Sequence, residues 1–185
     1  MNKVIKYDKL VLSEKSKSDF SKKVLIGGYT NCDILEYKRF KYFFIEYKKN
    51  IIGYVILGKV FNKNTNNQNW ILLNIEVFNE YRGYNIGNII LGKIHKYFIA
   101  KLNADSYIVA LNSYLMYKMI VREFKNEIVD FYCLINTEYS LEEMKIEEND
   151  LEEVFKQNPN VHADMIVSFT KEESEKVKSI YFKQL

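Results

Sequence analysis

The sequence has little cysteine, proline or histidine, the residues typical of disulfide-rich, proline-rich and metal-binding proteins. It holds two cysteines, one proline and two histidines among 185 residues. Cys32 and Cys133 stand far apart, which argues against a disulfide framework and favours buried thiols in a reducing compartment. A single proline and seven glycines exclude a proline-rich linker or a collagen-like repeat. No Cys/His cluster has the spacing of a metal site, and we expect His95 and His162 to be structural.

Long hydrophobic runs are missing as well. Stretches such as Ile51–Leu57 are too short to cross a bilayer, and the N-terminus lacks the apolar core of a signal peptide. We therefore expect a cytoplasmic protein without a membrane partner. A chain of this length suits one domain, residues 1–185, and contains no stretch with the composition of a linker.

The charge is also modest, because 27 Lys and Arg residues face 24 Asp and Glu residues, for a net charge of +3. A nucleic-acid-binding protein usually shows a dense basic patch, so we expect no nucleic-acid partner. A minor alternative is RNA or DNA binding by the Lys-rich aromatic segment 38–49. The acidic segment Glu138–Glu153 has two interpretations, a solvated helix face or a surface that attracts a cationic substrate.

Hydrophobic patterning predicts the secondary structure. Strand-like runs with aromatic and β-branched residues are expected at residues 3–7, 40–47, 51–57, 70–77, 106–111, 127–135 and 163–170. Helices are expected at 86–102 and 113–124, once or twice within 13–35, from Ser140 towards Phe155, and from Thr170 onwards. A polar loop is expected at Asn62–Asn69.

The order of these elements predicts an α+β fold. It has a mixed, mostly antiparallel sheet, flanking helices and a C-terminal helix. The strand at 70–77, the helix at 86–102 and the strand at 106–111 form one right-handed crossover, which places its two strands parallel.

The junction from Ile75 to Asn88 is the most informative segment, because it begins in a strand and ends in the first turn of a helix. The first amides of a helix lack internal partners and lie at the positive end of its dipole, so they can donate to an anion. Gly83 and Gly87 allow oxygen atoms to approach the backbone closely, and Arg82 adds a forked donor. Asn85 tolerates a left-handed turn conformation. Neither a P-loop nor a dinucleotide-binding glycine pattern is present, so the segment predicts a pyrophosphate site without Mg²⁺ or a P-loop lysine.

This junction resembles the acetyl-CoA-binding motif of the GNAT acetyltransferase superfamily. In that family, a strand ending in valine precedes Pro-Glu-x-Arg-Gly-x-Gly-x-Gly or Ala. Here Asn79 stands at the usual proline and Asn85 at the central glycine. The resemblance implies a GNAT-like fold, with acetyl-CoA as the cofactor and backbone groups of Ile75 and Val77 on its pantetheine arm. It implies a pyrophosphate bound by Arg82, Gly83, Tyr84, Asn85, Ile86, Gly87 and Asn88. Asn112 matches the asparagine that ends a strand and starts a helix in the family.

The resemblance further implies transfer of the acetyl group to a primary amine. Glu76 is the carboxylate nearest the proposed thioester and is our candidate general base, although Asn74 on the same strand face is suited to orienting a water instead. Tyr117 is the candidate general acid, but the family's tyrosine position aligns with Met119.

The acceptor is expected to be a small-molecule or peptide amine, and a homodimer is compatible because dimers are common in the family. The alternative is a CoA-binding or regulatory module whose catalysis has decayed, which Asn85 and Met119 suggest.

Overall fold

The computed structural model describes residues 7–25, 35–62, 67–111, 113–124, 128–137, 140–144, 152–153, 156 and 162–168. The chain divides into two compact units, Met1–His95 and Lys96–Leu185, with the boundary inside a helix. Each unit is described by itself. The prediction of a single domain over residues 1–185 stays a prediction.

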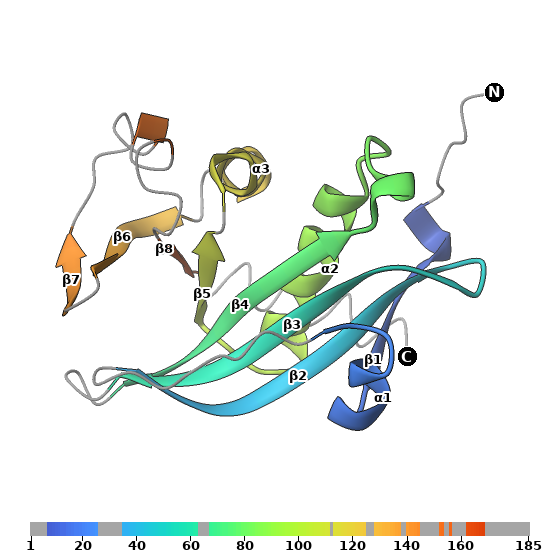
Figure 1. Ribbon diagram of the computed structural model, residues 1–185, viewed down its shortest axis with the longest axis horizontal. Coiled ribbons are helices and arrows are strands. Elements are labelled where there is room, and N and C mark those ends of the chain that lie inside the picture. Colours follow the sequence, from blue (N-terminus) through green and yellow to red (C-terminus); the bar gives the residue numbers. More distant parts are fainter. Residues whose placement is uncertain are drawn as a thin grey trace. The chain divides into compact units, whose positions relative to one another are not determined.

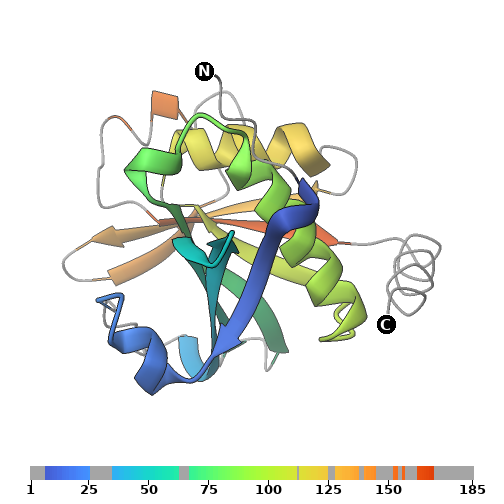
Figure 2. The same ribbon diagram turned by 90° about the vertical axis from the view of Figure 1, so that its right-hand side faces the viewer.

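The first unit contains four strands of the sheet, which pair antiparallel in the order β1-β2-β3-β4 and run from blue to green in Figure 1. After the 3-10 turn η1 (Tyr7–Lys9), its elements are β1 (Leu10–Lys15), α1 (Lys17–Ser21), β2 (Leu35–Tyr47), β3 (Asn50–Asn62) and β4 (Asn67–Val77). Figure 2 shows the short helix α1 directly after β1. Residues 52 to 58 of β3 are all buried, so side chains on both faces of this strand are covered.

The strands of this unit are longer than the sequence predicts. Asn62 pairs with Asn67, so Asn62 and residues 67–69 of the polar loop predicted at Asn62–Asn69 belong to β3 and β4, and residues 63–66 lie outside the described residues. Hydrogen bonding between neighbouring strands extends them into polar sequence whose side chains do not favour strands by themselves. Tyr7 belongs to the 3-10 turn η1, and the other residues of the strand predicted at 3–7 lie outside the described residues, among which the first strand begins at Leu10.

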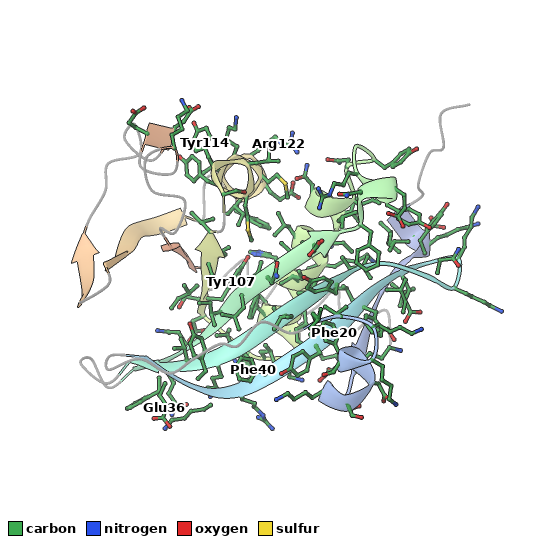
Figure 3. All side chains as sticks on the ribbon, in the orientation of Figure 1. Phe20, Glu36, Phe40, Tyr107, Tyr114 and Arg122 are labelled. Atoms are coloured by element: carbon green, nitrogen blue, oxygen red, sulfur yellow. The ribbon has the colours of Figure 1, made fainter. Side chains whose placement is uncertain are left out.

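Helix α1 is short but well capped. The Ser16 hydroxyl accepts a hydrogen bond from the Asp19 backbone N–H at 3.1 Å. The Lys22 ammonium donates to the Asp19 carboxylate at 2.8 Å, and this bond, with a second from Ser16, lowers the pKa of Asp19. Helix α1 carries Phe20, which is labelled in Figure 3. Its fully buried ring contacts Tyr42, Phe44 and Tyr54 of the sheet.

The turn after β4 leads into helix α2 (Ile86–Ala100) through the 3-10 turn η2 (Asn79–Tyr81). Ile86, Ile90 and Ile94 are buried at helical spacing and form the inner face of this helix, which the sequence predicts at 86–102. The predicted C-terminal end, Leu102, lies two residues beyond the observed one.

The second unit begins in the last turn of α2 and contains four further strands that pair antiparallel with one another. Its elements are β5 (Ser106–Leu111), α3 (Tyr114–Phe124), β6 (Ile128–Thr137), β7 (Ser140–Met144) and β8 (His162–Ser168), with the strands in the order β5-β8-β6-β7. Tyr107, Val109 and Leu111 alternate as buried residues of β5, and the Tyr107 ring stacks on Phe98 at 4.1 Å. Ser113 caps α3, because its hydroxyl accepts from the Met116 N–H at 3.2 Å.

One prediction in this unit is wrong in part. The acidic helix predicted from Ser140 towards Phe155 is replaced over its first turn by β7, which pairs with β6 from Thr137↔Ser140 to Cys133↔Met144, whereas Glu152 and Glu153 near its predicted end are helical. Pairing with a neighbouring strand thus overrides a local capping signal. The C-terminal helix predicted from Thr170 lies outside the described residues.

The predicted fold class is confirmed. The chain is α+β, strands within each unit pair antiparallel, and strand, helix and strand follow one another from β4 through α2 to β5. No helix among the described residues is long and apolar enough to cross a membrane.

The close approach of β3 and β4 leads to a prediction about Gly53. A Cβ atom at Gly53 would overlap the backbone oxygen of Glu76, whereas one at Gly58 would meet the tip of the Leu73 side chain at 2.8 Å. We expect Gly53→Ala to lower the free energy of unfolding by about 1–3 kcal/mol, because a backbone atom cannot rotate away. Gly58→Ala, the matched control, is expected to cost less. Urea unfolding measures both, and equal losses would contradict the close approach of β3 and β4.

Candidate functional site

Strand β4 carries a bulge four residues before its end. The register passes from Ile56↔Asn74 to Leu57↔Leu72, so Leu73 is an additional residue in β4. A bulge of this kind interrupts the ladder, increases the local twist and redirects the side chains that follow. The residues beyond it, Asn74 to Val77, form the strand end that the sequence assigns to the pantetheine arm.

Glu76 belongs to a side-chain network on one face of this strand end. The Tyr54 hydroxyl of β3 donates to Glu76 Oε2 at 2.7 Å, and Asn74 Nδ2 donates to the same hydroxyl at 3.4 Å. Tyr54 is 8% exposed, whereas the Glu76 side chain is 41% exposed. The buried tyrosine therefore holds a carboxylate that still reaches solvent.

Tyr54 was not among the residues selected from the sequence. It lies directly opposite Glu76 in the β3–β4 register, and residues opposite each other in an antiparallel pair share a face. The sequence predicts Tyr54 in a strand, but it does not give the pairing of that strand with β4. That pairing includes the bulge at Leu73, and only with it does Tyr54 come to lie opposite Glu76.

Arg82 is turned back towards the end of β4. Its Nε donates to the Val77 carbonyl oxygen at 2.9 Å, and its Nη2 lies 3.8 Å from Glu76 Oε1. The Arg82 side chain is 59% exposed, so this ion pair contributes little to stability by itself. Arg82 thus links the loop to the strand end, and its predicted contact with a pyrophosphate stays a prediction.

The turn between β4 and α2 contains two residues in the left-handed region. Gly83 has φ +86°, and Asn85 has φ +59°. Asparagine reaches this region more readily than other non-glycine residues, so Asn85 follows the backbone path for which the sequence pattern normally uses glycine. The Asn85 Oδ1 also accepts a hydrogen bond from Asn88 Nδ2 at 2.6 Å, which ties the turn to the first turn of α2.

The first turn of α2 presents the donors expected for an anion. The Ile89 N–H donates to the Asn85 oxygen at 3.4 Å, so the amides of Ile86, Gly87 and Asn88 precede the first bond of the helical ladder. Ile86 is 2% exposed and anchors the turn, while Gly87 adds no side chain over it. No acidic residue stands in the first turn of α2 to compete for these donors.

The remaining predicted cofactor residues lie in the same segment, with one exception. Ile75 and Val77 are half-buried in β4, and Tyr84 is 37% exposed in the turn. Asn112 lies outside the described residues. The structure therefore brings together the predicted residues between Ile75 and Asn88.

The candidate general acid, Tyr117, lies in the other unit. It is 4% exposed on α3, and its ring stacks on Tyr114 at 5.5 Å. Its predicted role stays a prediction.

Among the described residues, no group of three or more His, Cys, Asp or Glu side chains is arranged to hold a metal ion. His95 is buried in α2, and His162 begins β8.

Comparisons with known proteins give likenesses at the level of structure alone. No protein-family model matches the chain, and no curated protein matches it. The chain is similar to Arabidopsis thaliana Naa50 in complex with the bisubstrate analogue CoA-Ac-MVNAL, with 13% identity, a TM-score of 0.48, and coverage of 87% of this chain and 99% of that chain. It is also similar to the NatC complex bound to Gag peptide and CoA, with 13% identity, a TM-score of 0.41, and coverage of 70% and 71%. Both TM-scores are below 0.5, so these likenesses do not indicate the function of this chain.

The conformation of Asn85 leads to a second prediction. Asn85→Gly and Asn85→Ala both remove the hydrogen bond to Asn88, but only alanine is strained at φ +59°. We expect the alanine variant to have a free energy of unfolding lower than that of the glycine variant by about 1 kcal/mol. Urea unfolding of the two variants measures the difference. A more stable alanine variant would show that the turn does not need the left-handed conformation.

Proposed function

We propose that this chain binds acetyl-CoA through the turn at residues 82–88 and transfers its acetyl group to a primary amine. The observation that carries the proposal is the left-handed conformation of Asn85, the residue at which the sequence departs most from the pattern it resembles. Because Asn85 follows a glycine-like path, the departure leaves the backbone of the turn suited to its predicted ligand.

The donors of the turn suit a pyrophosphate. Amides at the start of α2, at the positive end of its dipole, are able to donate to phosphate oxygens, and Gly83 and Gly87 leave room for close approach. Arg82, with its exposed guanidinium, adds positive charge beside them. The absence of a carboxylate from the first turn of α2 removes a repulsive charge.

The strand end suits the reaction. Bound acetyl-CoA supplies the activated acetyl carbon, next to β4. Glu76, half-exposed at the end of this strand, accepts a proton from the acceptor amine as its nitrogen bonds to that carbon. The carbon–sulfur bond then breaks, and the departing sulfur takes up a proton, so the products are an amide and a free thiol. One proton in total passes from nitrogen to sulfur.

The acceptor is proposed to be a primary amine of a small molecule or a peptide. Of the acidic segment Glu138–Glu153 that favoured a cationic acceptor, Glu142 and Glu143 lie in β7, and residues 138–139 and 145–151 lie outside the described ones. A cationic amine, such as a polyamine, an aminoglycoside or a lysine side chain, therefore stays the first class to test.

Binding of CoA is tested by placing a negative charge at the start of α2. Gly87→Glu puts a carboxylate beside the amides of the first turn, where it repels the pyrophosphate and occupies its space. We expect the affinity for CoA, measured by calorimetry, to fall at least about 100-fold, which corresponds to about 2.7 kcal/mol.

The matched control is Asn50→Glu, which adds the same charge at an exposed position, the first residue of β3. It is expected to leave the affinity unchanged. CoA binding that is undetectable in the original protein, or that survives Gly87→Glu, would require the proposal to be abandoned.

Catalysis is tested separately at Glu76. Glu76→Gln preserves the shape of the side chain but removes its basicity, so we expect thiol release from acetyl-CoA with an amine acceptor to fall about 100-fold or more. CoA affinity should change far less than turnover, because Glu76 meets the turn only through its 3.8 Å contact with the exposed Arg82 side chain. Tight CoA binding without thiol release by the original protein, across a panel of amines, would instead favour a binding or regulatory module.

A further inference from the structure

The Glu76 carboxylate has a buried partner that the sequence pattern does not include. Tyr54 of β3 and Glu76 of β4 are paired in the register, and the Tyr54 hydroxyl donates to Glu76 Oε2 at 2.7 Å. The length is that of a strong hydrogen bond from a hydroxyl to a carboxylate. The contact crosses between strands, so it depends on the sheet and not on a local turn.

Asn74 completes the arrangement from the same face of β4. Its Nδ2 donates to the Tyr54 hydroxyl at 3.4 Å. A tyrosine hydroxyl has one proton to donate, and here that proton is directed to Glu76, so a second partner must itself be a donor. The Asn74 amide meets this condition, which favours the orientation in which Tyr54 donates to the carboxylate.

The Tyr54 ring is held on two sides. Phe20 of α1 meets it edge-on at 5.6 Å between ring centroids, and Phe78 lies at 6.4 Å. Tyr54 is 8% exposed, so its ring has little freedom to turn away from Glu76. A rigid aromatic side chain thereby fixes the position of a half-exposed carboxylate.

The two oxygens of Glu76 have different surroundings. Oε2 is bound by Tyr54, whereas Oε1 lies 3.8 Å from Arg82 Nη2, beyond the length of a hydrogen bond. Arg82 is itself fixed by its bond to the Val77 oxygen. Oε1 is therefore the oxygen suited to exchange a proton with a substrate.

We infer that Tyr54 is a positioning residue that holds Glu76 by Oε2, so that Oε1 accepts the proton of the acceptor amine. This inference rests on the proposed function. Tyr54 acts through Glu76 and not on the substrate, and Asn74 supports it by donating to its hydroxyl.

The experiment measures steady-state thiol release with acetyl-CoA and three probe acceptors, namely spermidine, an aminoglycoside and a lysine-bearing peptide. Tyr54→Phe removes only the hydroxyl. We expect kcat to fall about 10-fold to 100-fold, because the carboxylate loses its fixed position, while KM for acetyl-CoA stays unchanged. Tyr42→Phe removes a hydroxyl from another buried tyrosine of the same sheet, in contact with Phe20, and should leave kcat unchanged.

A double-mutant cycle separates positioning from general damage to the fold. If Tyr54 acts through Glu76, then Tyr54→Phe lowers kcat in the original protein but has no further effect in a Glu76→Gln background. Asn74→Ala is expected to lower kcat in the same direction by a smaller factor, and it provides a second variant if Tyr54→Phe folds poorly.

The outcomes distinguish this inference from the proposed function. The inference alone is overturned if Glu76→Gln abolishes turnover while Tyr54→Phe does not change kcat, or if the two losses multiply in the double variant. If the original protein binds CoA but releases no thiol with any probe, the catalytic part of the proposed function and this inference are overturned together.

Discussion

Gly53 of β3 lies so close to the backbone oxygen of Glu76 in β4 that no side chain fits between them. This approach draws the two strands together at the end where β4 leaves the sheet. It also places Tyr54, the next residue of β3, opposite Glu76. The hydrogen bond between these side chains, and the start of the turn that follows, both depend on the same short strand segment. A disturbance at Gly53 would therefore reach the carboxylate and the turn together.

The path from this strand end to α2 is fixed by hydrogen bonds to backbone oxygens. The Phe78 N–H donates to the Ile52 oxygen at 2.9 Å, which extends the contact with β3 one residue past the end of β4. Arg82 then reaches back to the Val77 oxygen, so the five-residue loop closes on itself before Gly83 turns the chain. The proposed thioester and pyrophosphate sites are thus held by one continuous segment, with the strand at one end and the helix dipole at the other.

The sequence predicts an element correctly where a local pattern, such as helical spacing or a capping residue, agrees with the final structure. The isoleucines of α2 recur with helical spacing, and Ser113 caps α3 where the sequence places the start of that helix. The sequence does not predict the structure correctly where pairing between distant strands determines the conformation. The segment from Ser140 has a capping signal yet pairs as a strand. Tyr54 was missed because a bulge shifts a register by one residue, and each such shift moves side chains to the other face.

Asn85 bears most directly on whether the site is functional or decayed. A residue that had merely replaced a glycine would strain the turn, but asparagine occupies φ +59° at small cost, and its side chain accepts a hydrogen bond from Asn88. Compared with glycine, Asn85 restricts the backbone and adds a hydrogen bond between the turn and the helix. A more restricted turn loses less conformational entropy when it binds an anion. Of the two residues that suggested decay, Asn85 therefore supports retained binding. The case for decay then depends on the proton for the departing thiolate, since Met119 stands at the tyrosine position of the pattern and Tyr117 is buried against Tyr114.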